Sequence, residues 1–296
     1  MLKKKSLGQN FLTSKTIAKS IALAGKPNPD ETIIEIGPGE GFLTEELLKI
    51  CNKIVVIEKD HRLIPVLKDK FKEEVKSRKL HILEGDILEI NIEKLMTSDL
   101  DAIRGDNEDC DQAVQNSTVR GATGVIDKGG RQIWSHYRII ANIPYYITGQ
   151  IIRKFLEANK KPISMTLLLQ KEVAERILAR DGKESLLSLS VKIFGKPSIV
   201  RTVGRGAFNP APNVDSAVLN IEEISDKKMD GINQNDFFKV IHAGFAHKRK
   251  QLLPNLSNLF NKDMVSQALI DLKINPKIRA EDVKLDDWIK ITKKII

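Results

Sequence analysis

The chain has 296 residues, enough for one large domain or two smaller ones with a buried core. Lysine and arginine number 48 against 39 acidic residues, and the net charge of +9 predicts a polyanionic partner, either nucleic acid or an anionic membrane surface. The 2 cysteines exclude a disulfide scaffold and a cysteine zinc site. The apolar runs are too short for a transmembrane helix or a secretory signal, so we expect a soluble, cytoplasmic protein.

Short apolar runs alternate with amphipathic stretches from residue 32 onwards. Buried strands are predicted at 32–36, 53–58, 80–86, 137–146, 164–170 and 216–222. Helices are predicted over 42–50, 61–71, 149–158 and 171–180. This alternation predicts an α/β fold, in which an open and mostly parallel sheet carries helices on both faces.

The pattern changes in the last quarter of the chain. Residues 225–235 are polar and rich in turn formers, which predicts a linker that closes a first domain over 1–224. Beyond it, Phe237, Ile241 and Phe245 recur at helical spacing together with Phe238. We therefore expect a small all-helical second domain over 236–296.

One long segment does not fit the alternation. Residues 97–135 contain many Asp, Asn, Gly and Gln residues, and their apolar residues show no regular helix or strand spacing. Structureless loops longer than about 12–15 residues are uncommon in compact domains and are usually functional or disordered. We favour a flexible surface insertion over the alternative of a lid that becomes ordered on binding.

A glycine-rich turn follows the first predicted strand in the segment IIEIGPGEG, residues 33–41. Gly37, Gly39 and Gly41 permit a tight turn and a close approach of the backbone to a ligand. The dinucleotide fingerprint G-x-G-x-x-G fails because position 42 is Phe42, and no G-K-[ST] follows to make a phosphate loop. With Glu35 two positions before the first glycine, the turn resembles the first motif of S-adenosylmethionine-dependent methyltransferases.

Acidic residues end the next two strands. Glu58 lies about 20 residues beyond the first glycine, where a carboxylate can accept hydrogen bonds from both ribose hydroxyls. Asp86 ends the third strand in the same register and is suited to meet the adenine amino group of the cofactor. Each alone is an ordinary strand-end carboxylate, but together they favour cofactor binding.

Asn142-Ile143-Pro144-Tyr145 closes the fourth strand and suggests a reacting centre. The amino nitrogen of a nucleobase is a poor nucleophile, so two acceptors on its N–H groups would help its lone pair to face a methyl donor. Asn142 Oδ1 and the Pro144 carbonyl are candidates for the acceptors. Tyr145 is a candidate to stack on one face of the base and Phe208 on the other.

No other catalytic or metal chemistry is indicated. The 5 histidines show neither metal-ligand nor catalytic-triad spacing, so we expect no metal.

Six segments in order resemble the ribosomal RNA adenine dimethylases: LGQNFL (7–12), IIEIGPGEG (33–41), VIEKD (56–60), EGD (84–86), ANIPYYI (141–147) and FNPAPNVDSAVLNI (208–221). The resemblance implies a Rossmann-like class I methyltransferase fold and S-adenosylmethionine as cofactor. It implies methylation of N6 of two adjacent adenosines near the 3′ end of small-subunit rRNA. It also implies that Asn10 and Leu12 line the cofactor pocket, together with Asn142.

Three basic clusters are candidates for RNA contact: Lys3, Lys4 and Lys5, then Arg201 and Arg205, then Lys248, Arg249 and Lys250. Each cluster alone can be ordinary solvated charge. The net charge favours phosphate contact for at least one of them, and such contacts set affinity and register more than sequence choice.

Several alternatives remain open from the sequence. The related large-subunit rRNA methyltransferases that confer antibiotic resistance share Asn-Ile-Pro-Tyr, although the segments LGQNFL and VDSAVLNI favour the small-subunit enzymes. A DNA adenine methyltransferase fits less well, because no segment resembles a target-recognition domain. A non-catalytic assembly or transcription factor that keeps the pocket is the third alternative. We expect a monomer, since no heptad or apolar seam is evident.

Overall fold

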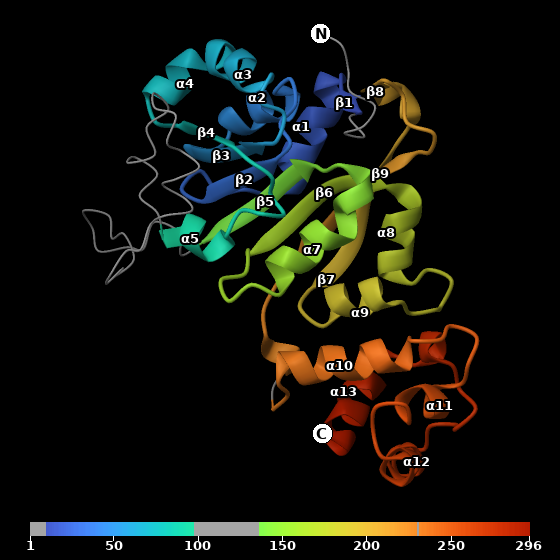
Figure 1. Cartoon of the computed structure of the whole chain (residues 1–296). Coiled ribbons are helices and arrows are strands. Elements are labelled where there is room, and N and C mark those ends of the chain that lie inside the picture. Colours follow the sequence, from blue (N-terminus) through green and yellow to red (C-terminus); the bar gives the residue numbers. More distant parts are fainter. Residues whose placement is uncertain (1–9, 98–135, 230) are drawn as a thin grey trace. The chain divides into compact units, whose positions relative to one another are not determined.

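The computed structural model describes residues 10–97, 136–229 and 231–296 (Figure 1). Contacts between Cα atoms divide the chain into two compact units. The first comprises the chain up to Lys171 together with Ser198–Glu222, and the second comprises Glu172–Pro197 together with Glu223–Ile296. The insertion expected over 97–135 lies outside the described residues beyond its first position. The domain boundaries expected from the sequence stay a prediction.

A seven-stranded sheet forms the centre of the first unit, in the order β4-β3-β2-β5-β6-β9-β7. Its strands are β2 (Thr32–Ile36), β3 (Lys53–Glu58), β4 (Leu80–Glu84), β5 (Tyr137–Asn142), β6 (Ser164–Gln170), β7 (Lys196–Val203) and β9 (Ser216–Glu222). Strands β2 to β6 pair in parallel, whereas β9 runs antiparallel to β6. The predicted α/β fold with a mostly parallel sheet is confirmed.

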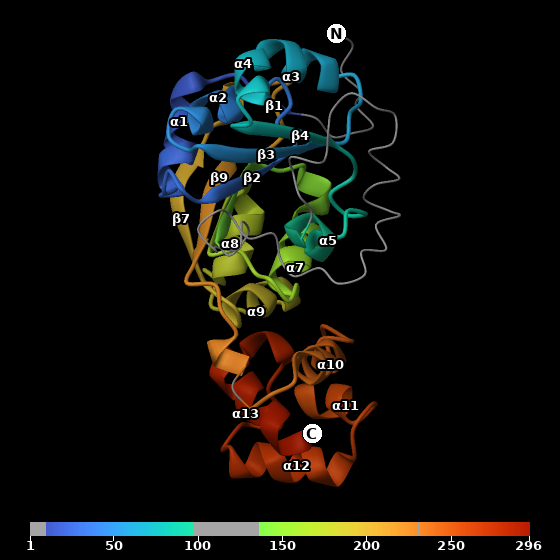
Figure 2. The same cartoon turned by 90° about the vertical axis from the view of Figure 1, so that its left-hand side faces the viewer.

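Both faces of the central strands are covered, which explains their continuous apolar sequence. Every residue of β2 is buried, as are the last five of β3, and strands covered on both faces lose the alternation of half-buried ones. Figure 2 shows α1 (Lys15–Ala24) and α2 (Phe42–Leu48) on one face of the sheet, with α5 (Ile92–Thr97) and α7 (Thr148–Leu156) on the other. Two further helices, α3 (Ile64–Lys70) and α4 (Lys72–Lys76), connect β3 to β4.

The register of the parallel strands aligns their carboxyl ends. Ile36 at the end of β2 pairs with Ile57 of β3, and Glu58 pairs with Glu84 at the end of β4. The turns after these strands therefore emerge at one edge of the sheet, which is where ligands bind in open α/β folds. The glycine turn, Glu58 and the turn that contains Asp86 all belong to this edge.

The second unit is mainly helical over its described residues, which also include the first two residues of β7. Its helices are α8 (Lys171–Leu178), α9 (Leu186–Lys192), α10 (Gln234–Gly244), α11 (Leu252–Leu256), α12 (Lys262–Asp271) and α13 (Leu285–Ile295). Phe237 and Trp288 are fully buried, and Phe245 stacks on Trp288 with 5.7 Å between ring centroids. Over the part of the chain that the structure describes, no helix combines the length and apolarity needed to cross a membrane.

Candidate active site

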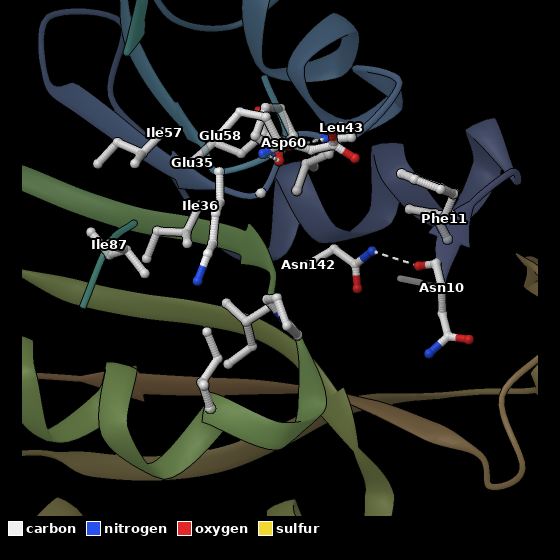
Figure 3. A pocket seen from close by; sticks show the side chains of 18 of the residues that line it. Asn10, Phe11, Glu35, Ile36, Leu43, Ile57, Glu58, Asp60, Ile87 and Asn142 are labelled. Atoms are coloured by element: carbon white, nitrogen blue, oxygen red, sulfur yellow. Dashed lines mark hydrogen bonds between the residues drawn. The ribbon is translucent and has the colours of Figure 1, made fainter. Parts of the chain in front are cut away.

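A pocket opens at the carboxyl ends of β2, β3, β4 and β5 (Figure 3). Of the residues expected to bind cofactor, those that line it are Asn10, Leu12, Gly37, Gly39, Glu58, Asp86 and Asn142. Pro144 and Tyr145 line the same pocket. The structure thus brings together residues that lie up to 135 positions apart in the sequence. Gly41 and Phe208 do not belong to this lining.

Two glycines let the backbone approach the pocket closely. Gly37 and Gly39 have φ values of +66° and +59°, in the left-handed region that side chains disfavour. A Cβ on Gly39 would lie 2.8 Å from Cδ1 of Phe11. A Cβ on Gly37 would lie 3.9 Å from the carbonyl oxygen of Asn142, between the glycine turn and the end of β5.

Gly41 has a different role from the other two glycines. It precedes α2 at φ +77°, and a Cβ there would lie 2.5 Å from the ring of Phe71. Its small size therefore permits the packing of α2 against the aromatic residue that follows α3. The geometry places Gly41 in the support of the pocket, while its expected contact with cofactor stays a prediction.

Glu58 is held with both carboxylate oxygens fixed. Oε2 accepts a hydrogen bond from the Gly39 N–H at 3.2 Å, and Oε1 accepts one from the Asp60 N–H at 2.8 Å. Burial raises the pKa of the Glu58 carboxyl above its ordinary value, while these two hydrogen bonds act in the opposite direction by stabilising the charged form. The strand-end acid is thus tied directly to the glycine turn.

Asp86 is oriented by an ion pair that the sequence analysis missed. Lys59 Nζ donates to Asp86 Oδ2 at 2.6 Å, and the Leu88 N–H donates to Oδ1 at 2.9 Å. Partial burial favours the neutral acid, but the hydrogen bonds from Lys59 and Leu88 outweigh it and hold the pKa of Asp86 below its ordinary value. The available signal was proximity: Lys59 directly follows Glu58 at the same sheet edge.

Glu35 lies on β2 beneath the glycine turn and is 1% exposed. Its Oε2 accepts a hydrogen bond from the Thr44 hydroxyl at 2.7 Å. Burial raises the pKa of Glu35 to about 8 despite this hydrogen bond, which favours the charged form. A carboxyl with this pKa is mostly neutral at pH 7.

The Asn142–Tyr145 segment links the end of β5 to a 3₁₀ helix that begins at Tyr145. Asn142 Nδ2 donates to the backbone oxygen of Asn10 at 3.4 Å (Figure 3), which orients the amide. The Pro144 carbonyl accepts the Ile147 N–H at 3.3 Å and retains a second lone pair. The Tyr145 hydroxyl hydrogen-bonds Ser216 Oγ at 2.6 Å. The segment therefore combines an oriented amide, a backbone acceptor and an anchored aromatic ring.

A small second sheet brings the N-terminal motif to the pocket. β1 (Phe11–Leu12) pairs antiparallel with β8 (Phe208–Asn209), with Leu12 opposite Phe208. Phe208 is 5% exposed and packs in the hydrophobic core. Phe11 also lines the pocket, and no chemical signal in the sequence marked it. The stacking role expected of Phe208 stays a prediction.

The predicted basic clusters fall in different parts of the chain. Arg201 and Arg205 are exposed residues of the first unit, whereas Lys248, Arg249 and Lys250 form an exposed turn of the second unit. Lys3, Lys4 and Lys5 lie outside the described residues.

Over residues 10–97, 136–229 and 231–296, no three side chains of His, Cys, Asp or Glu gather closely enough to hold an ion.

The fold and this pocket define a Rossmann-like methyltransferase of class I. The family model described as ribosomal RNA adenine dimethylase matches residues 1–296. A relative from Dehalococcoides mccartyi strain CBDB1 is 37% identical over 97% of this chain and 87% of its own length. Another, from Clostridioides difficile strain 630, is 34% identical over 96% of this chain and 88% of its own. Both are named ribosomal RNA small subunit methyltransferase A. The chain belongs to the ribosomal RNA adenine dimethylase family, whose members use S-adenosylmethionine.

Two solved structures share the fold. A dimethyladenosine transferase from Plasmodium falciparum matches with a TM-score of 0.70 at 24% identity, over 95% of each chain. The 23S rRNA methyltransferase ErmE matches with a TM-score of 0.64 at 20% identity, over 97% of this chain and 99% of its own. At these identities the likeness concerns the fold, which agrees with the sheet described above.

Proposed function

We propose that this protein transfers methyl groups from S-adenosylmethionine to N6 of two adjacent adenosines near the 3′ end of 16S-type small-subunit rRNA. The product is N6,N6-dimethyladenosine, and the reaction serves the biogenesis of the small subunit in the cytoplasm. The observation that carries the proposal is the shared pocket: the Asn142–Tyr145 segment and the Gly37–Glu58 region line one cavity. The names of the curated relatives support the small subunit as the substrate.

The residues of the pocket fit S-adenosylmethionine. A buried carboxylate on Glu58 suits two ribose hydroxyls, and Asp86 suits the exocyclic amine of adenine. Ile57 and Ile87 line the pocket next to these acids and provide apolar contact for the adenine ring (Figure 3). Asn10, Leu12 and Gly37 line the same pocket and are candidates to enclose the methionine part. When bound, the cofactor supplies the methyl group on a positively charged sulfur.

The residues at the end of β5 orient the target amine. Asn142 Oδ1 and the Pro144 carbonyl accept its two N–H groups, which directs the nitrogen lone pair toward the methyl group. Tyr145 stacks on the adenine ring. Phe208, which lies in the core and outside the pocket lining, stays the candidate for the other face. The reaction needs no nucleophilic side chain, because the adenine nitrogen is itself the nucleophile and releases its proton to solvent. Positioning of the two reactants can contribute up to about 7–11 kcal/mol to lowering the barrier.

The exposed basic residues contact the rRNA backbone. Arg201 and Arg205 on the sheet unit and Lys248, Arg249 and Lys250 on the helical unit supply cations for phosphate contacts. The partner is the immature small subunit, and the enzyme acts as a monomer. In this arrangement residues 1–224 form the methyltransferase domain, 225–235 the linker, and 236–296 the RNA-contacting domain.

Mapping of modified nucleotides tests the substrate. The protein is incubated with labelled S-adenosylmethionine and undermethylated small or large subunits, and the labelled positions are identified. We expect dimethylation of two neighbouring adenosines in small-subunit RNA. Label only on large-subunit RNA would select the resistance-type reaction, and no label on either would select a non-catalytic factor.

Two substitutions separate the proposed roles. Glu58→Ala is expected to weaken cofactor binding, because the ribose loses its acceptors, whereas Tyr145→Ala is expected to spare cofactor binding and to lower turnover. Calorimetry measures the affinity, and single-turnover methylation measures the chemical step. Equal affinity in wild type and Glu58→Ala would remove the ribose role from Glu58.

A further inference from the structure

An aromatic side chain stands exposed at the rim of the pocket. Tyr146 is 59% exposed and belongs to the pocket lining. Among the described residues, Tyr146 is the one aromatic residue in the set of exposed large hydrophobic side chains. It is also the only member of that set that lines the pocket. Scattered apolar residues are normal on a protein surface, but a ring at the mouth of a site that receives a nucleobase has a specific use.

The local backbone explains why two neighbouring tyrosines differ. Tyr145 and Tyr146 open the 3₁₀ helix η2 (Tyr145–Ile147), in which successive side chains diverge by about 120°. The Tyr145 hydroxyl is hydrogen-bonded to the buried Ser216, and the Tyr145 carbonyl accepts from Thr148 Oγ1 at 3.0 Å. The turn is therefore anchored through Tyr145, and it presents Tyr146 outward from a fixed base.

A cation accompanies the ring at the rim. The Lys59 side chain is 54% exposed while its ammonium pairs with Asp86. The pKa of Lys59 lies above its ordinary value, chiefly because of the hydrogen bond to Asp86, with a smaller contribution from Tyr146. Lys59 and Tyr146 both line the pocket. An exposed ring and a lysine in one pocket lining match a nucleotide, which has a flat base and a negatively charged phosphate.

An adenine that is to be methylated must leave its base stack to enter the pocket, which deprives the neighbouring base of a stacking partner. We propose that the ring of Tyr146 is a stacking subsite for the nucleobase next to the target adenosine, so that one adenosine of the pair is held at the rim while the other reacts. This inference rests on the proposed function and adds to it a site for the second nucleotide. Stacking tolerates any base, so the subsite strengthens binding without choosing the sequence.

Substitutions at position 146 test the subsite. Tyr146→Leu removes the ring but keeps an apolar side chain. It is expected to raise KM for undermethylated small subunits about tenfold, because the loss of one base–aromatic stack weakens binding by about a factor of ten. The chemical step measured at saturating RNA and the cofactor affinity measured by calorimetry should change little. Tyr146→Phe restores the ring and should return KM most of the way to wild type. Leu23→Ala removes another exposed apolar side chain, one that does not line the pocket, and serves as the control.

A double-mutant cycle identifies the partner of the ring. The 3′ end of the RNA is ligated with an abasic nucleotide in place of one adenosine of the pair, and methylation of the other is measured with wild type and Tyr146→Leu. If the ring stacks on the neighbouring base, each change alone weakens binding and the two together add little. Additive effects would overturn the subsite, and so would a KM for Tyr146→Leu equal to that of Leu23→Ala. In either case, methylation of small-subunit RNA by wild type would still uphold the proposed function. Absence of small-subunit methylation by wild type would overturn both.

Discussion

The buried Glu35 makes the stability of the protein depend on pH in a predictable direction. Its folded pKa is about 8, against an ordinary value of 4.5. Below pH 4.5 the carboxyl is neutral in both states, so its burial costs little. Between pH 4.5 and 8 the unfolded chain releases the proton while the folded chain retains it, so stability falls as pH rises. Above pH 8 the loss is complete.

The size of this effect follows from the two pKa values. A difference of about 3.5 pH units, at 1.36 kcal/mol per unit, corresponds to a loss of about 5 kcal/mol. Glu35→Gln keeps an acceptor for the Thr44 hydroxyl and cannot ionise. We therefore expect its free energy of unfolding to be near that of wild type at pH 5, and to exceed it by up to about 5 kcal/mol at pH 9.

Urea unfolding followed by circular dichroism, at constant ionic strength and without cofactor, measures this difference from pH 5 to pH 9. Thr44→Val provides a second test. Without the Thr44 hydroxyl, which favours the charged form of Glu35, the fall in stability should extend to higher pH than in wild type. If the curves of wild type and Glu35→Gln run parallel throughout, Glu35 is ionised in the folded protein and the reasoning is wrong.

Three further predictions concern the glycine turn, the pocket rim and the RNA contacts. Gly41→Ala should lower the free energy of unfolding by about 2–4 kcal/mol, because its backbone is left-handed and its Cβ would overlap a ring; a loss below about 1 kcal/mol in urea unfolding would contradict this. Lys59→Met should raise the pKa of Asp86, because the carboxylate loses the cation that favours its charged form. When the pH is lowered from 8 to 4, cofactor affinity measured by calorimetry should therefore begin to fall at a higher pH in the variant than in wild type. Coincident profiles would refute the role of the ion pair. Charge reversal of Lys248 and Arg249 should weaken small-subunit binding and lower the slope of log affinity against log salt by about 0.7–0.9 per lost phosphate contact; an unchanged slope would exclude them from the interface.

Strands with strong local signals were predictable from the sequence. The runs at 32–36, 53–58 and 216–222 coincide with β2, β3 and β9, because continuous apolar sequence reports burial on both faces. Strand β7 was missed: most of its residues are exposed or half-exposed at the edge of the sheet, so its sequence lacks that signal. The predicted strand over 137–146 ends earlier, at Asn142, because Tyr145 and Tyr146 belong to the 3₁₀ helix η2.

The site could be predicted where chemistry depends on residue type and order along the chain. Glycines after β2 and acids at or after the ends of β3 and β4 share one edge because parallel strands align their carboxyl ends. Contacts that depend on side-chain packing were out of reach. The Lys59–Asp86 pair joins two turns, and the hydrogen bond between Tyr145 and Ser216 spans 71 positions, so neither has a local signature.

A crystal structure of the protein with S-adenosylhomocysteine, the product left when the methyl group has been transferred, tests the proposed arrangement of the site most directly. We expect the ribose hydroxyls within hydrogen-bond distance of the Glu58 carboxylate and the sulfur facing the Asn142–Tyr145 segment. A nucleoside bound away from Glu58, or a sulfur directed away from Asn142, would contradict it.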